Sequence, residues 1–276
     1  KHTPLSAFGE FGLIDHLTKD FKNQQASTVK GVGDDAAVID SGGLQTIVST
    51  DLLIEGVHFD LSFMPLKHLG YKAVIVNLSD IYAMNAAPSQ ITVSLAISNR
   101  FSVEAMDELY AGIKHACDTY NVDLVGGDTT SSLQGLSISI TAIGHAKSED
   151  LVYRNGAKEG DFICVSGELG SAYMGLQLLN REKQVYLDNP DMQPKLEEHQ
   201  FLVGKQLKPE ARKDIVAYLK EQEIKINAMI DVSDGLSSEL MHICKQSGVG
   251  CLVYEANVPI SNDTYNQALE FNIDPI

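Results

Sequence analysis

The sequence has little positive charge. Its 276 residues include 21 Lys and Arg against 37 Asp and Glu, which gives a formal net charge of -16 at pH 7. A surface with this excess of anions repels phosphate backbones, so nucleic acid is excluded as the default partner. Tryptophan is absent as well, but its absence decides nothing about function.

Long hydrophobic runs are also missing. No apolar stretch approaches the roughly 18 to 20 residues that cross a bilayer, and the amino-terminal residues do not resemble a secretory signal. We therefore expect a cytoplasmic protein with no membrane-spanning segment.

Cysteine is scarce, with four residues and no pair at CxxC spacing. In a chain of this length, such scattered cysteines are typical of reduced, partly buried thiols rather than of a disulfide framework or a zinc site. Cys244 and Cys251 could still meet if the chain turns at Gly248 and Gly250.

The overall balance is that of a folded domain. Apolar residues make up 44% of the chain and charged residues 21%, which is too apolar for disorder. The length suits one large or two modest domains. A polar stretch at 147–160 suggests a boundary, so we expect one domain over residues 1–147 and a second over 148–276.

Strand-like and helix-like patterns alternate along the chain, which favours an α/β architecture. Residues 36–39 and 46–49 flank a turn and predict a hairpin, and the alternation over 136–143 predicts a strand. Shorter apolar runs predict further strands at 162–165 and 228–230. The segments with helical patterns are 71–87, 103–120, 171–180 and 236–246. The polar, proline-containing residues 181–200 predict a surface connection.

Carboxylates recur in small-residue segments beside apolar runs. Any one segment is explained by ordinary turn or helix-cap chemistry. Five of them at the ends of predicted elements would converge at one edge of a sheet, where their charges repel unless cations lie between them. Ligand sets made only of oxygen favour a hard ion such as Mg²⁺, which in turn implies a nucleotide or another polyphosphate. The five acidic turns are 31–35, 49–51, 77–80, 126–130 and 231–235.

Two familiar nucleotide motifs are excluded. Residues 31–36 match GxGxxA, but Asp34 and Asp35 would place negative charge where a pyrophosphate must lie. No GxxxxGK[ST] sequence is present. The turn at 231–235 is more informative, because Asp231 and Asp234 flank a predicted strand-to-helix turn. Both carboxylates could hold one ion while the helix N-terminus faces a phosphate. The alternative is that Asp234 only caps the helix.

In their order and spacing, these segments resemble the thiamine-monophosphate kinase family across nearly the whole chain. The segments that carry the resemblance are Phe8-Gly9-Glu10-Phe11-Gly12-Leu13-Ile14, Gly33-Asp34-Asp35-Ala36-Ala37, Ser49-Thr50-Asp51, Gly56-Val57-His58-Phe59, Asn77-Leu78-Ser79-Asp80, Gly126-Gly127-Asp128-Thr129-Thr130, Pro209-Glu210-Ala211-Arg212 and Asp231-Val232-Ser233-Asp234-Gly235.

The resemblance implies an α/β (α+β) protein with the two-domain fold shared with aminoimidazole ribonucleotide synthetase. In that fold the sheet of the N-terminal domain joins that of a second copy to form a homodimer, and a C-terminal α/β domain packs alongside. The family continues into a Gly-Gly-Glu-Asp-Tyr-Glu-Leu segment that contributes a substrate-binding glutamate. The present chain stops at Ile276, about where that segment should begin, so the resemblance also implies an incomplete C-terminal domain.

The resemblance further implies transfer of the γ-phosphoryl group of ATP to thiamine monophosphate, dependent on Mg²⁺. His58 matches a substrate-contacting position, and Asp35, Asp128 and Asp234 are the expected catalytic residues. The positions matching ATP contacts are Gly127, Asp128, Arg154 and Ser233, and Tyr120 lies near a nucleotide-contacting position. The positions matching metal ligands are Asp35, Ser49, Thr50, Asp51, Asp80, Asp128, Asp231 and Asp234.

The chemistry of such a transfer needs no general base, because a phosphate acceptor is largely ionised at pH 7. We expect direct in-line transfer without a covalent intermediate, with the repulsion between two anions offset by bound cations. Arg154 is the candidate phosphate clamp, and a surface arginine is the equally weighted alternative.

Three other functions stay open from the residues. One is a different enzyme of the same superfamily, although selenophosphate synthetase relies on an N-terminal Cys or selenocysteine and no cysteine precedes Cys117 here. The others are a non-catalytic nucleotide or metal sensor and an acidic structural domain. Profiling of phosphate acceptors and of Mg²⁺-dependent nucleotide binding would separate them.

Overall fold

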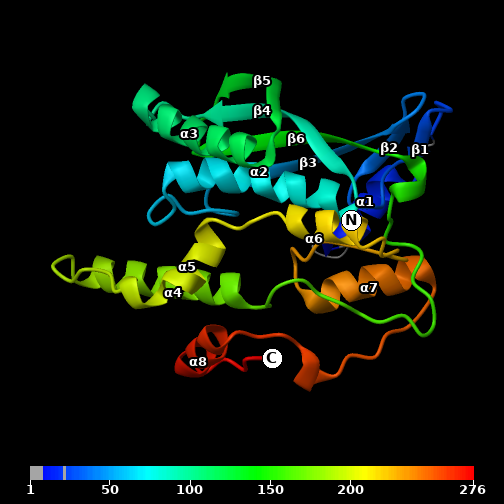
Figure 1. Ribbon diagram of the computed structural model, residues 1–276. Helices are drawn as coiled ribbons and strands as arrows, with labels where there is room; N and C mark the ends of the chain where they lie inside the picture. Colours follow the sequence, from blue (N-terminus) through cyan, green and yellow to red (C-terminus); the bar gives the residue numbers. More distant parts are fainter. Residues whose placement is uncertain (1–8, 21–22) are drawn as a thin grey trace, which may run out of the picture.

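The computed structural model describes residues 9–20 and 23–276; the start of the chain, which bears on the signal-peptide expectation, lies outside the described residues. Figure 1 shows a sheet with helices packed below it. The strands are β1 (Thr28–Lys30), β2 (Ala37–Asp40), β3 (Gln45–Ile54), β4 (Ala87–Ile97), β5 (Asp123–Ser131) and β6 (Leu136–Ala146). The α-helices are α1 (Gly9–Thr18), α2 (Leu66–Ala83), α3 (Val103–Tyr120), α4 (Ser171–Asp188), α5 (Gln200–Leu207), α6 (Lys213–Glu221), α7 (Leu236–Ser247) and α8 (Asn262–Glu270).

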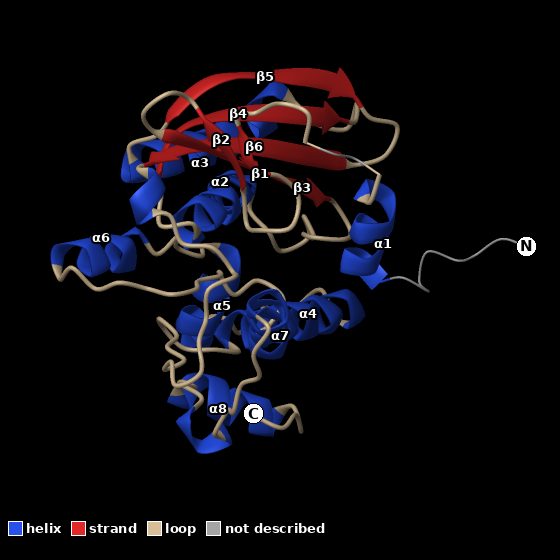
Figure 2. Cartoon of the chain, turned by 90° about the vertical axis from the view of Figure 1, so that its right-hand side faces the viewer, coloured by secondary structure: helices blue, strands red, loops and turns tan. Residues whose placement is uncertain are grey.

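The six strands form one mixed sheet in the order β1-β2-β3-β6-β4-β5. The β4–β5 pair is parallel and the other pairs are antiparallel. Figure 2 shows the strands gathered at one side of the molecule and the helices of the carboxyl-terminal part at the other. The predicted hairpin is confirmed as β2 and β3, and the predicted alternation in β6 buries Leu136, Ile138 and Ile140 against the core.

Helices α2 and α3 cover one face of this sheet and meet through two glycines. A Cβ atom on Gly70 would lie 2.0 Å from the carbonyl oxygen of Leu109, and one on Gly112 would lie 1.9 Å from that of Lys67. Helix α3 has the predicted bounds. Helix α2 is displaced from the predicted range of 71–87: it begins at Leu66 and ends at Ala83, and Ala87 is the first residue of β4. It begins earlier because its internal Gly70 serves close helix packing and does not break the helix.

The carboxyl-terminal part differs from the expected α/β domain. Beyond β6 the described residues contain helices but no strand, so the strands predicted at 162–165 and 228–230 are wrong. Extended, apolar segments become strands only when a neighbour pairs with them, and neither segment forms a ladder with a described one. The surface connection predicted at 181–200 is wrong at its start, because α4 continues to Asp188. The division into two domains stays a prediction.

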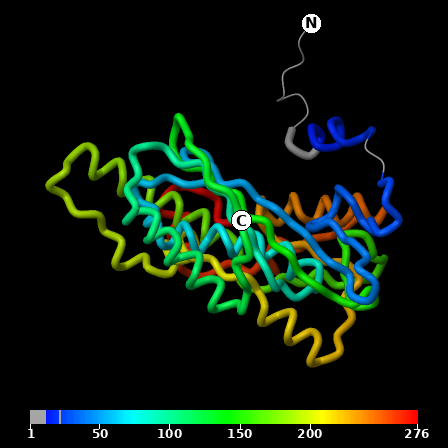
Figure 3. The backbone as a smooth tube through the Cα atoms, turned by 90° about the horizontal axis from the view of Figure 1, so that it is seen from above, coloured from blue at the N-terminus to red at the C-terminus, as the bar shows by residue number. Residues whose placement is uncertain are grey.

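The two parts of the chain pack together. The main hydrophobic core extends from the sheet and α2 to Leu179 and Leu207 of the carboxyl-terminal part. The β1–β2 end of the sheet lies over α7, as Figures 1 and 3 show from two directions. There the Gln246 side chain donates a hydrogen bond of 2.7 Å to the carbonyl of Gly33. Within the described residues, no helix has the length and apolar character needed to cross a membrane.

All four cysteines are free thiols. Cys244 and Cys251 do meet, across a turn in which Gly248 has φ of 69°. Burial and a hydrogen bond with the Cys251 thiol raise the pKa of Cys244.

Candidate metal and phosphate site

Three carboxylates from distant parts of the chain form an acidic cluster. Asp35 follows β1, Asp80 lies on α2 and Asp231 precedes α7, and one oxygen of each lies within 4.8 Å of the others. The cluster therefore joins the sheet, the helix that covers it and the carboxyl-terminal part of the chain.

Strand β3 contributes to the same place. Successive side chains of a strand point to opposite faces, so Ser49 and Asp51 share the face that is turned toward α2. The Ser49 hydroxyl donates to the Asp80 carboxylate. The backbone N–H of Asp51 donates to the Asn77 side chain at 3.0 Å, and Asn77 is fully buried. Asn77 thus anchors the backbone of Asp51 to α2.

Burial and mutual repulsion raise the pKa values of these carboxyl groups. Burial, followed by the charges of Asp231 and Asp51, raises the pKa of Asp80 from 3.8 to about 8. Burial raises the pKa of Asp35 to about 6 against the opposing effect of Arg154. The pKa values of Asp51 and Asp231 are also raised, in both cases mainly by burial. A cation bound among these carboxyl groups would favour their ionised form.

Two basic side chains compensate part of this charge at the loop between β1 and β2. The Arg154 guanidinium donates a hydrogen bond of 2.6 Å to Asp35, and the Lys30 ammonium lies 3.2 Å from Asp34. One buried oxygen of Asp35, Oδ2, has no hydrogen-bond partner among the described residues. An oxygen-only donor set with an unpartnered carboxylate oxygen fits a hard divalent cation.

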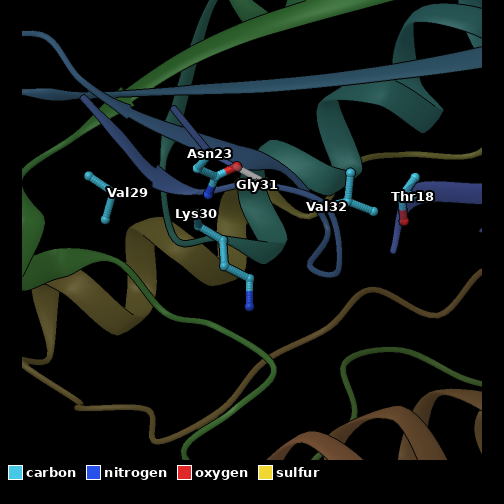
Figure 4. Close-up of a pocket in the computed structure, with 6 residues that line it drawn as sticks. All are labelled: Thr18, Asn23, Val29, Lys30, Gly31 and Val32. Carbon is cyan, nitrogen blue, oxygen red and sulfur yellow. The ribbon is translucent and has the colours of Figure 1, made fainter. Parts of the chain in front are cut away.

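An open pocket borders this loop. Figure 4 shows Lys30 extending from the end of β1 beside the pocket. The residues that line the pocket are Thr18, Asn23, Val29, Lys30, Gly31 and Val32.

The loop before α7 is held by a buried glutamate. Glu239 is 4% exposed, and its Oε1 accepts hydrogen bonds from the backbone N–H groups of Ser233 at 3.2 Å and Asp234 at 2.8 Å. Asp231 in the same loop accepts a hydrogen bond of 2.7 Å from the Ser79 hydroxyl of α2.

Comparison with known proteins identifies the family. Residues 33–146 match the model of the AIR synthase related protein, N-terminal domain. The thiamine-monophosphate kinase of Aquifex aeolicus is 34% identical over 273 residues, which are 99% of this chain and 82% of that protein. The chain belongs to the thiamine-monophosphate kinase family.

Further matches agree with that assignment. The thiamine-monophosphate kinase of Bacillus subtilis is 35% identical over 255 residues, which are 92% of this chain and 75% of that protein. The solved structure of AaThiL complexed with AMPPCP and TMP superposes with a TM-score of 0.85 at 31% identity, covering 99% of this chain and 82% of that one. The chain thus shares its fold with this kinase over nearly its full length.

Three of the acidic segments expected as turns lie in regular elements of the kinase fold. Residues 49–51 are inside β3, 77–80 inside α2 and 126–130 inside β5. Small polar residues are common in turns, but here they lie where strands and a helix pack closely. Gly127, with φ of 155°, shows this: a Cβ atom there would lie 1.8 Å from the carbonyl oxygen of Val93. The position therefore requires glycine.

The structure does not bring all the expected kinase residues together. Asp128 and Asp234 are exposed and are not part of the three-carboxylate group. Thr50 faces away from the cluster, and its hydroxyl donates to the carbonyl of Ile140 at 3.0 Å.

Two further positions have other partners. The buried hydroxyl of Tyr120 bonds both the carbonyl and the N–H of Ala211, at 3.2 and 3.0 Å. His58 follows β3, and its Nδ1 accepts a hydrogen bond of 2.9 Å from the N–H of Ile54. His58 also lowers the pKa of Asp51, so it lies within electrostatic reach of the cluster.

Sequence reasoning missed the residues that support the acidic ones. Asn77 and Ser79 belong to one of the five acidic segments, but nothing in the sequence indicates their roles, and no motif includes Lys30 or Glu239. Glu239 carries a weak signal, since an acidic residue in the first turn of a helix often bonds the preceding backbone N–H groups.

Proposed function

We propose that this chain transfers the γ-phosphoryl group of ATP directly to thiamine monophosphate, forming thiamine diphosphate with the aid of Mg²⁺. The observation that carries the proposal is the acidic cluster of Asp35, Asp80 and Asp231, with Asp51 beside it. Two polyanionic substrates can approach such a cluster only with divalent cations between them. The related AaThiL structure contains AMPPCP and TMP, which supports the same pair of ligands here.

The protein's own residues have distinct roles in this proposal. Asp35, Asp51, Asp80 and Asp231 would hold the cation, which when bound neutralises charge on the phosphate oxygens. Arg154, now paired with Asp35 at 2.6 Å, would bind a phosphate once the cation takes over its carboxylate partner. Asp128 and Asp234 would complete the site from its exposed side.

The transfer needs no nucleophilic side chain. An ionised oxygen of the acceptor phosphate attacks Pγ, a new P–O bond forms, and the bond to the bridging oxygen breaks with its electron pair leaving on ADP. The protein contributes alignment and charge compensation, so we propose no covalent phosphoenzyme.

We also propose a homodimer formed through the sheet. β5 is an edge strand that pairs only with β4 among the described residues, and it leaves Leu124 and Val125 44% and 58% exposed. An exposed edge of this length favours pairing with a second copy. Sedimentation equilibrium giving a monomer mass at micromolar concentration would refute the dimer.

The reaction is tested with purified protein, ATP and thiamine monophosphate. We expect thiamine diphosphate and ADP in equal amounts when Mg²⁺ is present and neither product with excess EDTA. Asp80→Asn should lower turnover by about a hundredfold or more, because an amide cannot replace a charged metal ligand. The exposed variant Asp118→Asn is the control.

Other outcomes separate the alternatives. Mg²⁺-dependent ATP binding in calorimetry without diphosphate product would favour a sensor, and product from a different acceptor would favour another enzyme of the superfamily. With γ-labelled ATP, label recovered on the protein as a competent intermediate would contradict direct transfer.

A further inference from the structure

The loop of residues 231–235 carries Asp231 and Asp234 of the proposed site. Its N–H groups at Ser233 and Asp234 both donate to one oxygen of Glu239. Helix α7 begins directly after Gly235, whose φ of 121° is a conformation that other residues rarely adopt. Glu239 therefore fixes the position of this loop relative to the start of α7.

We propose that Glu239 is a positioning residue for the cation site, an inference that rests on the proposed function. By holding the backbone at Ser233 and Asp234, it sets the direction in which Asp231 enters the acidic cluster. It acts through the loop and touches neither substrate in this scheme.

The negative charge of Glu239 is electrostatically unfavourable so close to the acidic cluster. Glu239 is buried, and its charge raises the pKa of Asp231, so it adds to the repulsion within the cluster. The two backbone hydrogen bonds require an acceptor oxygen at the end of a side chain as long as that of glutamate, and they do not require a negative charge. Two substitutions separate these properties: Glu239→Gln keeps the side-chain length and removes the charge, whereas Glu239→Asp keeps the charge and shortens the side chain.

Helix α4 offers a matched control. Glu182 is 7% exposed and also anchors a loop, since its Oε2 accepts a hydrogen bond of 2.8 Å from the backbone N–H of Lys195. Its contacts lie in the carboxyl-terminal part and none involves the acidic cluster. Glu182→Ala thus reproduces the loss of a buried, loop-anchoring carboxylate without disturbing the site.

The experiment measures Mg²⁺ dependence in two ways, by calorimetric ATP binding and by turnover, for Glu239→Ala, Glu239→Gln, Glu239→Asp and Glu182→Ala. Melting temperatures show which variants fold. For Glu239→Ala and Glu239→Asp we expect the Mg²⁺ concentration at half effect to rise by about tenfold or more, as for other residues that orient metal ligands. Glu239→Gln should stay within about threefold of the parent, and Glu182→Ala should lower the melting temperature only.

Two results would contradict the positioning role. One is a Mg²⁺ dependence of Glu239→Asp equal to that of the parent. The other is a defect in Glu239→Gln as large as that in Glu239→Asp. If the parent forms no thiamine diphosphate, the proposed function fails, whereas the binding measurement still tests Glu239. If Glu239→Ala does not fold, the comparison of glutamine with aspartate gives the answer.

Discussion

The carboxyl group of Asp80 accepts a proton far more readily than an ordinary aspartate. Its pKa of about 8 in the folded protein lies above the 3.8 expected for the unfolded chain. The folded state therefore binds more protons between these values, and the metal-free protein loses stability as pH rises from about 4 to 8. Below about pH 4 the Asp80 carboxyl is neutral in both states, and this destabilising effect is absent.

Asp80→Asn should remove this pH dependence. At pH 8 with EDTA we expect the variant to be more stable than the parent on the order of 2 kcal/mol, because a neutral amide escapes the repulsion of Asp51 and Asp231. Near pH 4.5 the two proteins should be similar. Urea unfolding at both pH values makes the comparison, with exposed Asp118→Asn as the control. Equal pH slopes for parent and variant would contradict the expectation.

Among the elements, α2 and α3 depend on the smallest side chains where they cross. Gly70 and Gly112 each leave room only for the carbonyl of the facing helix. The same two helices cover the buried face of the sheet, and α2 also carries Asn77, Ser79 and Asp80. A change in the packing of these two helices would therefore also affect the helix that carries Asp80.

Gly112→Ala should push the two helices apart and cost about 2 to 4 kcal/mol of unfolding free energy. Gly204→Ala is a matched control, since Gly204 also lies inside a helix but a Cβ atom there meets nothing within 4 Å. The control should be neutral or slightly stabilising, because alanine favours a helix over glycine. Chemical denaturation of both variants gives the comparison. Equal effects at the two sites would show that close packing is not the cause.

Across the whole molecule, the acidic cluster lies between the amino-terminal and carboxyl-terminal parts of the chain. Asp35, in the loop after β1, and Asp80, on α2, belong to the amino-terminal part, and Asp231 belongs to the carboxyl-terminal part. A cation bound among them would act as a link between the two parts and would stabilise the folded state by mass action.

Saturating Mg²⁺ with an ATP analogue should therefore raise the melting temperature by about 5 °C, since ligand at a hundredfold excess over its Kd is worth about 2.7 kcal/mol. Differential scanning calorimetry against EDTA, with ionic strength matched by NaCl, measures the shift. Asp80→Asn should lose most of it. An equal shift from NaCl alone would mean that general screening of the -16 net charge is responsible.

The amino-acid sequence by itself determined the elements whose side-chain periodicity is strong, such as Val103–Tyr120 and the strand that begins at Leu136. It also determined the family and the set of acidic segments. Such features depend on residue types and on neighbours a few positions away. They can be read without knowing the rest of the fold.

Only the tertiary structure decided which acidic residues meet. It brought Asp35, Asp80 and Asp231 together, left Asp128 outside that group and turned Thr50 to the opposite face of β3. It also left 162–165 and 228–230 without strand partners. Convergence and strand pairing depend on contacts between segments that are far apart in the chain, and no local pattern records which segments those are.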